Sequence, residues 1–238
     1  MSFAICDSAT YNNSMSHIIH SINKLYGSQP KASPHRFLAW EKCYKYFNEN
    51  KYILRCEADM TGKLPDPPML HLATYLATWG MYQGDDNFLL KTDYSVYNGI
   101  VREMLKKDYD GLWAKDRDID KIAGKANERT EFVETLAGAA MQMREIWAKY
   151  KPCDLLLTKM LMGTYGSTVA YDPHVQEGLK KWGISHQFDK NSIYGLLNFY
   201  LTHRDELNML LPMHSGRGEY PIMRKMDMYF FVHGDGGR

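Results

Sequence analysis

The stretch that organises this sequence runs Thr164-Tyr165-Gly166-Ser167-Thr168-Val169-Ala170-Tyr171-Asp172-Pro173-His174-Val175. It places one carboxylate, Asp172, after an apolar run and at the start of a new helix, because Asp is a preferred N-cap residue and proline is tolerated at the first helical position. Val175, Leu179 and Trp182 follow at i, i+4 and i+7, the spacing of a helix that packs an apolar face on a core. On spacing alone, Asp172 is interpreted as a helix cap.

Helical periodicity dominates the rest of the chain. A helix that opens at Ser33-Pro34 carries aromatic residues at spacings of three and four: Phe37, Trp40, Tyr44 and Phe47. Further helices are predicted over residues 69–79, 94–106, 128–150, 155–162, 191–211 and 221–233, with a charged helix or excursion over 115–127. Residues 69–79 are apolar on nearly every side, as in a central buried helix, and Asp86 is placed to cap a helix through Leu90. Only residues 52–56 have an extended pattern, so the sequence predicts an all-α protein of roughly nine or ten helices.

Length and composition favour one folded unit. With 238 residues and 45% hydrophobic content, the chain is long enough to bury a full core, and no repeat or low-complexity linker divides it. We expect residues 1–238 to form a single compact unit. Within it, residues 66–150 form a central helical lobe, and residues 1–65 together with 151–238 form a second lobe.

The same composition narrows location and chemistry. No apolar run is long enough to span a membrane and the first ten residues lack a secretory pattern, so we expect a cytoplasmic protein without a membrane partner. The four cysteines lie far apart and predict buried free thiols rather than a disulfide framework, while the nine histidines form no ligand pair, so we expect no metal and no cofactor. The formal net charge of +1 neither favours nor excludes a nucleic-acid partner.

Two segments resemble the helix-hairpin-helix DNA glycosylases, the superfamily of endonuclease III, MutY and 8-oxoguanine glycosylase. In that family an aromatic–Gly turn leads through a short apolar run to Val-Asp-Thr-His-Val/Ile, which residues 165–175 resemble, and the position of the family's catalytic carboxylate matches Asp172. The helix over 70–78, which ends in Trp79-Gly80-Met81-Tyr82-Gln83, is similar to the family helix that ends in the loop wedged into the DNA stack. The resemblance implies a two-lobed helical architecture with a cleft between the lobes.

The chain also departs from the family pattern. Where the family hairpin carries Leu-Pro-Gly-Val-Gly, residues 149–154 read Lys-Tyr-Lys-Pro-Cys-Asp, which leaves Lys151 as a charge for a phosphate but removes both glycines. The positions of the lyase lysine are Asp154 and Leu155, and the iron–sulfur cysteines of the endonuclease III branch are missing. The resemblance therefore implies a monofunctional enzyme whose partner is DNA with a damaged or modified base.

Candidate roles follow for the residues around these segments. An ionised Asp172 stabilises the oxocarbenium-like sugar that forms when a flipped base departs. The remaining candidates for DNA contacts or a base pocket are Trp79, Met81, Tyr82, Gln83, Lys151, Lys159, Tyr171, His174, Arg217 and Asp227. Asp227 is alternatively the partner of an arginine in a buried ion pair, and the aromatic residues of the loop are alternatively core residues.

Three functions remain open at this stage. The first is a DNA glycosylase, for which a modified viral base in a defence setting is one candidate substrate. The second is a non-catalytic descendant of the same fold that binds nucleic acid or protein, in which Asp172 is only a cap. The third is an N-glycosidase of free nucleosides or nucleotides, whose binding would lack the strong salt dependence expected for DNA.

Overall fold

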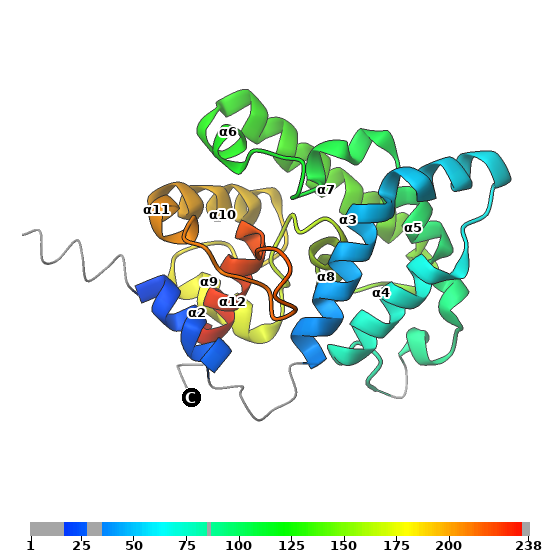
Figure 1. Cartoon of the computed structure of the whole chain (residues 1–238), viewed down its shortest axis with the longest axis horizontal. Helices are drawn as coiled ribbons and strands as arrows, with labels where there is room; N and C mark the ends of the chain where they lie inside the picture. Colours follow the sequence, from blue (N-terminus) through cyan, green and yellow to red (C-terminus); the bar gives the residue numbers. More distant parts are fainter. Residues whose placement is uncertain (1–16, 28–34, 85–86, 235–238) are drawn as a thin grey trace, which may run out of the picture.

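The described part of the protein is built from helices. The computed structural model describes residues 17–27, 35–84 and 87–234, and within these ranges the one β-type pairing is an isolated bridge between Pro212 and Glu219. The α-helices (Figure 1) are α2 (His17–Gly27), α3 (His35–Thr61), α4 (Asp66–Thr78), α5 (Asn98–Met104), α6 (Ile119–Gly124), α7 (Ala126–Ile146), α8 (Asp154–Thr164), α9 (Pro173–Lys181), α10 (Lys190–Thr202), α11 (Arg204–Leu207) and α12 (Ile222–Gly234). Short 3-10 helices are η1 (Phe88–Leu90), η2 (Tyr94–Tyr97), η3 (Lys107–Leu112) and η4 (Ala148–Tyr150). The all-α prediction is confirmed.

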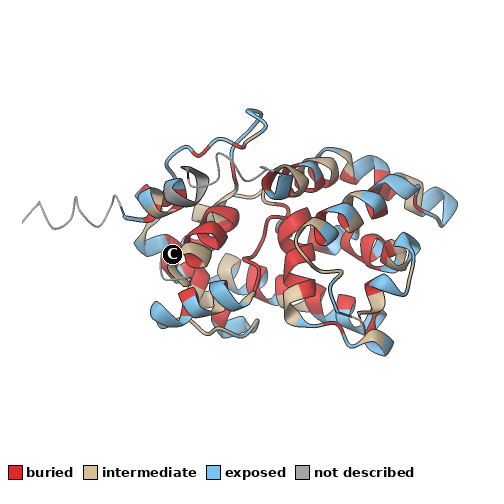
Figure 2. Ribbon diagram, turned by 90° about the horizontal axis from the view of Figure 1, so that it is seen from below, coloured by how far each residue is buried: buried red, intermediate tan, exposed pale blue. Residues whose placement is uncertain are grey.

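Helix α8 lies at the centre of the molecule. Every residue from Leu156 to Thr164 is buried, and α3, α4 and α7 all pack against this helix. Figure 2 shows the buried residues running through the middle of the molecule, with exposed residues on the outer faces of the surrounding helices. An apolar helix surrounded on all sides is the expected state for a segment with no polar stripe.

A second group of helices is organised by α9 and α12, which lie side by side in Figure 1 and form the most extensive helix pair. Their backbones approach closely at Gly178, where an added Cβ atom would lie 2.2 Å from the carbonyl oxygen of Phe230. Helix α2 packs on the other side of α12, and α11 contacts both α2 and α12. This group carries Asp172 at the N-terminus of α9.

The segment between α8 and α9 is buried along its whole length, from Tyr165 to Tyr171. Its start is fixed by the hydroxyl of Tyr165, which donates to the carbonyl of Met104 at 2.6 Å, and by Arg117, which donates to the carbonyl of Gly166 at 2.9 Å. Gly166 has φ +67°, and a Cβ there would lie 2.8 Å from the ring of Tyr44. The chain therefore reaches Asp172 along a fixed path.

Some sequence predictions were wrong in detail. Residues 52–56 are not extended but lie within α3, whose helical pattern continues through them. Helix α4 buries one face only, as the 45% exposure of Leu70 shows. The central buried helix is α8 instead. Among the described cysteines only Cys43 is buried, whereas Cys56 and Cys153 are exposed. Asp86 lies outside the described residues, and η1 is capped by Asn87.

Two other observations concern membrane-spanning helices and groups of metal-ligating side chains. Among the helices of the described residues, none combines the length and the apolar character needed to cross a membrane. Within the same residues, no group of three or more His, Cys, Asp or Glu side chains is arranged to hold a metal ion.

Candidate functional site

Asp172 caps helix α9 and keeps one carboxylate oxygen free. Its backbone is extended, and its Oδ1 accepts a hydrogen bond from the amide of Val175 at 2.9 Å, with Pro173 at the first helical position. The residue is half-buried. Its second oxygen, Oδ2, accepts no hydrogen bond from the described part of the chain. One oxygen is thus committed to the helix, and the other is left for water or a ligand.

Lys159, from the middle of α8, brings a positive charge to the same region. Its side chain is nearly buried, and its Nζ donates to the carbonyl oxygen of Trp79 at 3.1 Å and lies 5.1 Å from the centre of the indole ring. Burial lowers the pKa of this amine, and the charges of Asp172 and Asp227 oppose that shift. Lys159 therefore links α8 to the C-terminal end of α4 and places a positive charge in the electrostatic field of Asp172.

Asp227, on α12, holds the chain just before Asp172. Its Oδ1 accepts a hydrogen bond from the amide of Ala170 at 2.8 Å, and its Oδ2 forms an ion pair with Arg224 one turn earlier on the same helix. The pKa of Asp227 is raised to about 6, chiefly because the carboxyl is buried; the charge of Arg224 opposes this increase and the charge of Asp172 adds to it. The expected ion pair with an arginine is present, and the residue also lies in the electrostatic field of Asp172.

Arg224 is enclosed by aromatic rings. The side chain is 1% exposed, and its guanidinium carbon lies 5.7 Å from the ring centre of Phe37, 5.2 Å from that of Trp40 and 5.0 Å from that of Trp79. Its Nε and Nη2 atoms have no hydrogen-bond partner in the described residues. The cation is stabilised instead by the ion pair with Asp227 and by the faces of the rings.

Trp79 ends helix α4 and is half-buried beside these charges. Its indole Nε1 donates to the carbonyl of Arg36 at 3.0 Å, which ties it to the start of α3, and its ring meets Phe37 edge to face at 6.4 Å. Both Lys159 and Arg224 lie about 5 Å from its ring centre. Trp79 thus combines a fixed position with some exposed aromatic surface.

We refer to Asp172, Lys159, Trp79, Arg224 and Asp227 as the Asp172 cluster. The two cations and two carboxylates come from α8, α9 and α12, and the indole closes the group from α4. The structure therefore brings together four residues singled out in the sequence, Asp172, Trp79, Lys159 and Asp227. A carboxylate with a free oxygen, flanked by charges and an aromatic surface, is suited to stabilise a developing positive charge.

The loop after Trp79 is ordered by contacts within the protein. Tyr82 is half-buried and its hydroxyl lies 2.8 Å from the hydroxyl of Tyr97, which belongs to the core. The carbonyls of Met81 and Gln83 both accept hydrogen bonds from the side chain of Asn87, at 2.6 and 3.1 Å. Gln83 is exposed and its amide packs over Gly80. The loop thus presents Gln83 outward, while Met81 and Tyr82 pack against the core.

Tyr171 and His174 lie on either side of Asp172 in sequence but not in the Asp172 cluster. Tyr171 is buried, and its hydroxyl lies 2.6 Å from the hydroxyl of Ser192 on α10. His174 is exposed on α9, with its ring 5.1 Å from that of Phe231 on α12. Tyr171 ties the segment before α9 to α10, and His174 lies on the face of α9 toward α12.

Lys151 and Arg217 also lie apart from the cluster. Lys151 is exposed in the turn between η4 and α8, where its φ of 49° is the one positive value among the described non-glycine residues. This left-handed geometry normally favours glycine. Lys151 adopts it although residues 149–154 contain no glycine. Arg217 is exposed on the loop between α11 and α12, whose backbone is anchored by Glu41 through the amides of His214 and Ser215.

Sequence reasoning missed part of this site. Phe37 and Trp40 were named only for their helical spacing, although they contact the cation of Arg224. The ion pair of Asp227 was predicted without naming its arginine, which the spacing of three residues between Arg224 and Asp227 identifies. Glu41 gave no signal, because its three partners, His214, Ser215 and Tyr220, lie far away in the sequence.

Comparisons with known proteins add nothing to this geometry: no family model matches the chain, and no curated protein or solved structure matches it. The functional argument therefore depends on the residues themselves.

Proposed function

We propose that this protein is a monofunctional DNA glycosylase that excises a damaged or modified base. The observation that carries the proposal is the state of Asp172, whose Oδ1 caps α9 while its Oδ2 accepts no hydrogen bond from the described residues and lies in the electrostatic field of Lys159 and Asp227. The resemblance of residues 165–175 to the catalytic segment of the helix-hairpin-helix glycosylases is the second support. The proposal includes two helical lobes with a DNA-binding cleft that opens at the Asp172 cluster.

The chemistry requires one well-placed carboxylate. As the N-glycosidic bond breaks, positive charge develops on the deoxyribose, and Oδ2 of Asp172 stabilises it electrostatically. The same oxygen orients the water that attacks C1′ and accepts its proton. The negative charge of Asp172 lies at the N-terminus of α9, where the amides and the helix dipole interact favourably with an anion. Removing one such electrostatic contribution lowers enzymatic rates by about 100-fold to 1,000-fold.

The surrounding charges act on Asp172 rather than on substrate. Lys159 is nearly buried, and its amine donates to the carbonyl of Trp79, so it serves as a fixed positive charge and not as a Schiff-base nucleophile. Asp227 positions residue 170, two residues before the carboxylate. The enzyme therefore releases the base and leaves an abasic site, without cutting the strand.

The substrate base must leave the helical stack to reach this carboxylate, which costs a few kcal/mol and costs least for damaged or weakly paired bases. The exposed surface of Trp79 offers a stacking platform for the flipped base. Gln83, which the adjacent loop presents to solvent, is the candidate to enter the vacated space. A modified base carried by viral DNA is one substrate of this class, which would give the enzyme a role in defence.

Abasic-site formation tests the proposal. Wild-type protein and the Asp172→Asn variant are incubated with duplex and single-stranded DNAs that carry damaged bases and bulky modified pyrimidines, followed by hot alkali. We expect alkali-dependent strand breaks from the wild type and none from the variant, because Asn retains the helix cap but lacks the charge. Breaks without alkali would contradict the monofunctional assignment.

The competing functions give different results in the same assay. A non-catalytic binding protein yields no abasic sites, and its DNA affinity is unchanged by Asp172→Asn. A nucleoside N-glycosidase releases base from free nucleosides, with little dependence on salt. The proposed enzyme binds DNA with an affinity that falls steeply as the salt concentration rises, because phosphate contacts release counterions.

A further inference from the structure

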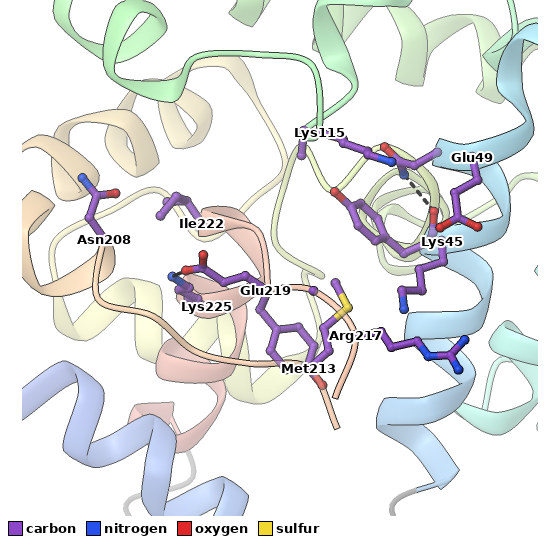
Figure 3. A pocket seen from close by; sticks show the side chains of 14 residues that line it. Lys45, Glu49, Lys115, Asn208, Met213, Arg217, Glu219, Ile222 and Lys225 are labelled. Carbon is purple, nitrogen blue, oxygen red and sulfur yellow. Dashed lines mark hydrogen bonds and ion pairs between the residues drawn. The ribbon is translucent and has the colours of Figure 1, made fainter. Parts of the chain in front are cut away.

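A cavity lies between α3 and the loop that joins α11 to α12, and none of the residues of the Asp172 cluster lines it. Its volume is about 760 Å³, within the usual range for small-molecule sites. Figure 3 shows Lys45 and Glu49 approaching it from α3, and Met213, Arg217 and Glu219 approaching it from the loop. Nothing in the proposed excision chemistry uses this cavity.

The rim of this cavity carries positive charges that have no partner among the described residues. Lys45, Lys115 and Arg217 line it from three separate segments, and none of them forms an ion pair or side-chain hydrogen bond with the described residues. Lys225 is different, because it is buried and paired with Glu219. Glu49 is then the one uncompensated carboxylate, and the cavity retains an excess of positive charge suited to a phosphate.

Asn48 lines the cavity with an amide whose orientation is fixed. Its Nδ2 donates to the carbonyls of Tyr44 and Thr164, each at 2.8 Å. Its Oδ1 has no hydrogen-bond partner among the described residues but has almost no accessible surface. Asn48 therefore contributes a rigid part of the lining and does not offer an acceptor to a ligand.

The walls complete a site for a flat organic group. Tyr44 and Tyr220 line the cavity together with the apolar side chains of Met213 and Ile222. The cavity thus combines cations at the rim with aromatic and apolar walls. A free inorganic anion would use only the first of these two features.

We propose that this cavity binds a nucleotide, with the phosphate held by Lys45, Lys115 and Arg217 and with the base packed against the aromatic and apolar walls. The nucleotide is either a free mononucleotide or one unit of a DNA strand, since both present the same phosphate, sugar and base. The proposal is independent of base excision, because none of these side chains belongs to the Asp172 cluster.

Calorimetric titration tests this site on the full-length Asp172→Asn protein, which cannot alter its ligand by excision. The probes are adenosine 5′-monophosphate, adenosine, ribose 5-phosphate and inorganic phosphate. We expect the nucleotide to bind most tightly and the other three at least about tenfold more weakly, because each lacks either the charge-assisted contacts or the base. Equal affinity for inorganic phosphate and the nucleotide would overturn the proposal.

Matched variants locate the binding. Lys45→Gln and Arg217→Gln, at exposed or half-exposed side chains, should each weaken nucleotide binding by about tenfold. Lys63→Gln, at an exposed lysine outside the cavity, should leave the affinity unchanged. Unchanged affinity in all three variants, or no binding at millimolar nucleotide, would overturn the proposal.

A final titration identifies the source of the nucleotide. A short single-stranded oligonucleotide that displaces the mononucleotide, with an affinity that depends on Arg217, identifies a DNA strand as the occupant. An oligonucleotide that binds without displacing the mononucleotide identifies a free nucleotide. Both outcomes support a nucleotide site, and neither depends on the excision activity.

Discussion

Helices α9 and α10 begin with the same cap but differ in what surrounds it. Asp172 accepts from the amide of Val175 at 2.9 Å, and Asp189 accepts from the amide of Ser192 at 2.7 Å, so each aspartate caps its helix through the third residue after it. The second oxygen of Asp189 also accepts from the hydroxyl of Ser185 at 3.1 Å, within its own loop. The second oxygen of Asp172 accepts no hydrogen bond from the described residues and lies near Lys159 and Asp227 instead.

This difference separates a structural cap from a candidate catalytic group. A carboxylate whose two oxygens are both hydrogen-bonded by the protein is fully used in holding the fold. A carboxylate with one free oxygen retains an acceptor for another molecule. Its position next to a buried ion pair adds a free-energy cost, because charged groups in a low-dielectric surrounding must be paired. Substitutions in the surroundings of each of the two caps test whether this difference is real.

The largest effect is expected from the buried ion pair of Arg224 and Asp227 on α12, which belongs to the surroundings of the Asp172 cap. Arg224→Met preserves the bulk of the side chain but leaves Asp227 without its cation, so we expect the free energy of unfolding to fall by about 3 to 5 kcal/mol. The counterpart on the α10 side is Ser185→Ala, which removes one hydrogen bond to Asp189 and should cost about 1 kcal/mol. Urea denaturation measures both, and equal losses would show that the two caps have equivalent surroundings.

The packing of the two helices gives the next contrast. Gly178→Ala in α9 places a Cβ 2.2 Å from the carbonyl oxygen of Phe230, so the backbones must separate, and we expect a loss of about 3 kcal/mol. Gly195→Ala in α10 meets a methyl group of Ile184 at 2.7 Å, which can move, and alanine favours the helix by up to about 1 kcal/mol. Thermal unfolding should therefore show a much larger drop for Gly178→Ala. A similar change in both would mean that α9 is not held by close backbone contact.

Much of the fold, and part of the site, followed from the sequence. The cap at Asp172 and the helix after it were predictable because proline and the apolar spacing are local signals. The lysine at position 159 and the tryptophan at 79 were named as candidates, but their mutual contact joins residues 80 apart in the sequence, which no local pattern encodes. The charges around Asp172 come from Lys159 on α8 and Asp227 on α12, and no local sequence pattern predicts that these residues meet.

The aromatic enclosure of Arg224 shows the same limit. Phe37 and Trp40 have the spacing of core residues, and they are buried as the pattern predicts. Their additional contact with a buried cation arises from the packing of α12 on the start of α3, which periodicity alone does not specify. Residues 52–56, for which the sequence suggested an extended pattern, lie inside the long helix α3, whose packing decides their conformation.

A smaller contrast is expected when each cap is removed. Asp172→Ala should cost about 1 kcal/mol, the usual loss for an N-cap. Asp189→Ala should cost about 2 kcal/mol, because the contact with Ser185 is lost as well. Denaturation curves of the two alanine variants decide the order, and a larger loss at Asp172 would indicate that its second oxygen has a structural partner.

The pH dependence of stability offers the finest test. The pKa of Asp227 is raised to about 6 in the folded state from an ordinary value of 3.8, so the folded protein holds this proton more tightly than the unfolded chain. The contribution of protonated Asp227 to stability is complete below pH 3.8 and is lost as the pH rises through 6. The stability of the wild type relative to Asp227→Asn should therefore decline across this range.

The same titration distinguishes the two caps. Because the charge of Asp172 helps to raise the pKa of Asp227, Asp172→Asn should move the decline to lower pH, whereas Asp189→Asn should leave it in place. Unfolding free energies measured in buffers across this range give the answer. A shift of equal size in both variants would contradict the electrostatic coupling between Asp172 and Asp227.

The most direct test of the central claim compares Asp172→Asn with Asp189→Asn in single-turnover base excision on the DNA that the wild type processes. Both substitutions keep a side chain that caps a helix, and each removes one charge. We predict that Asp172→Asn lowers the excision rate by at least about 100-fold while Asp189→Asn leaves it within about twofold. Equal rates in the two variants, or no excision by the wild type on any modified DNA, would show that Asp172 is a helix cap and nothing more.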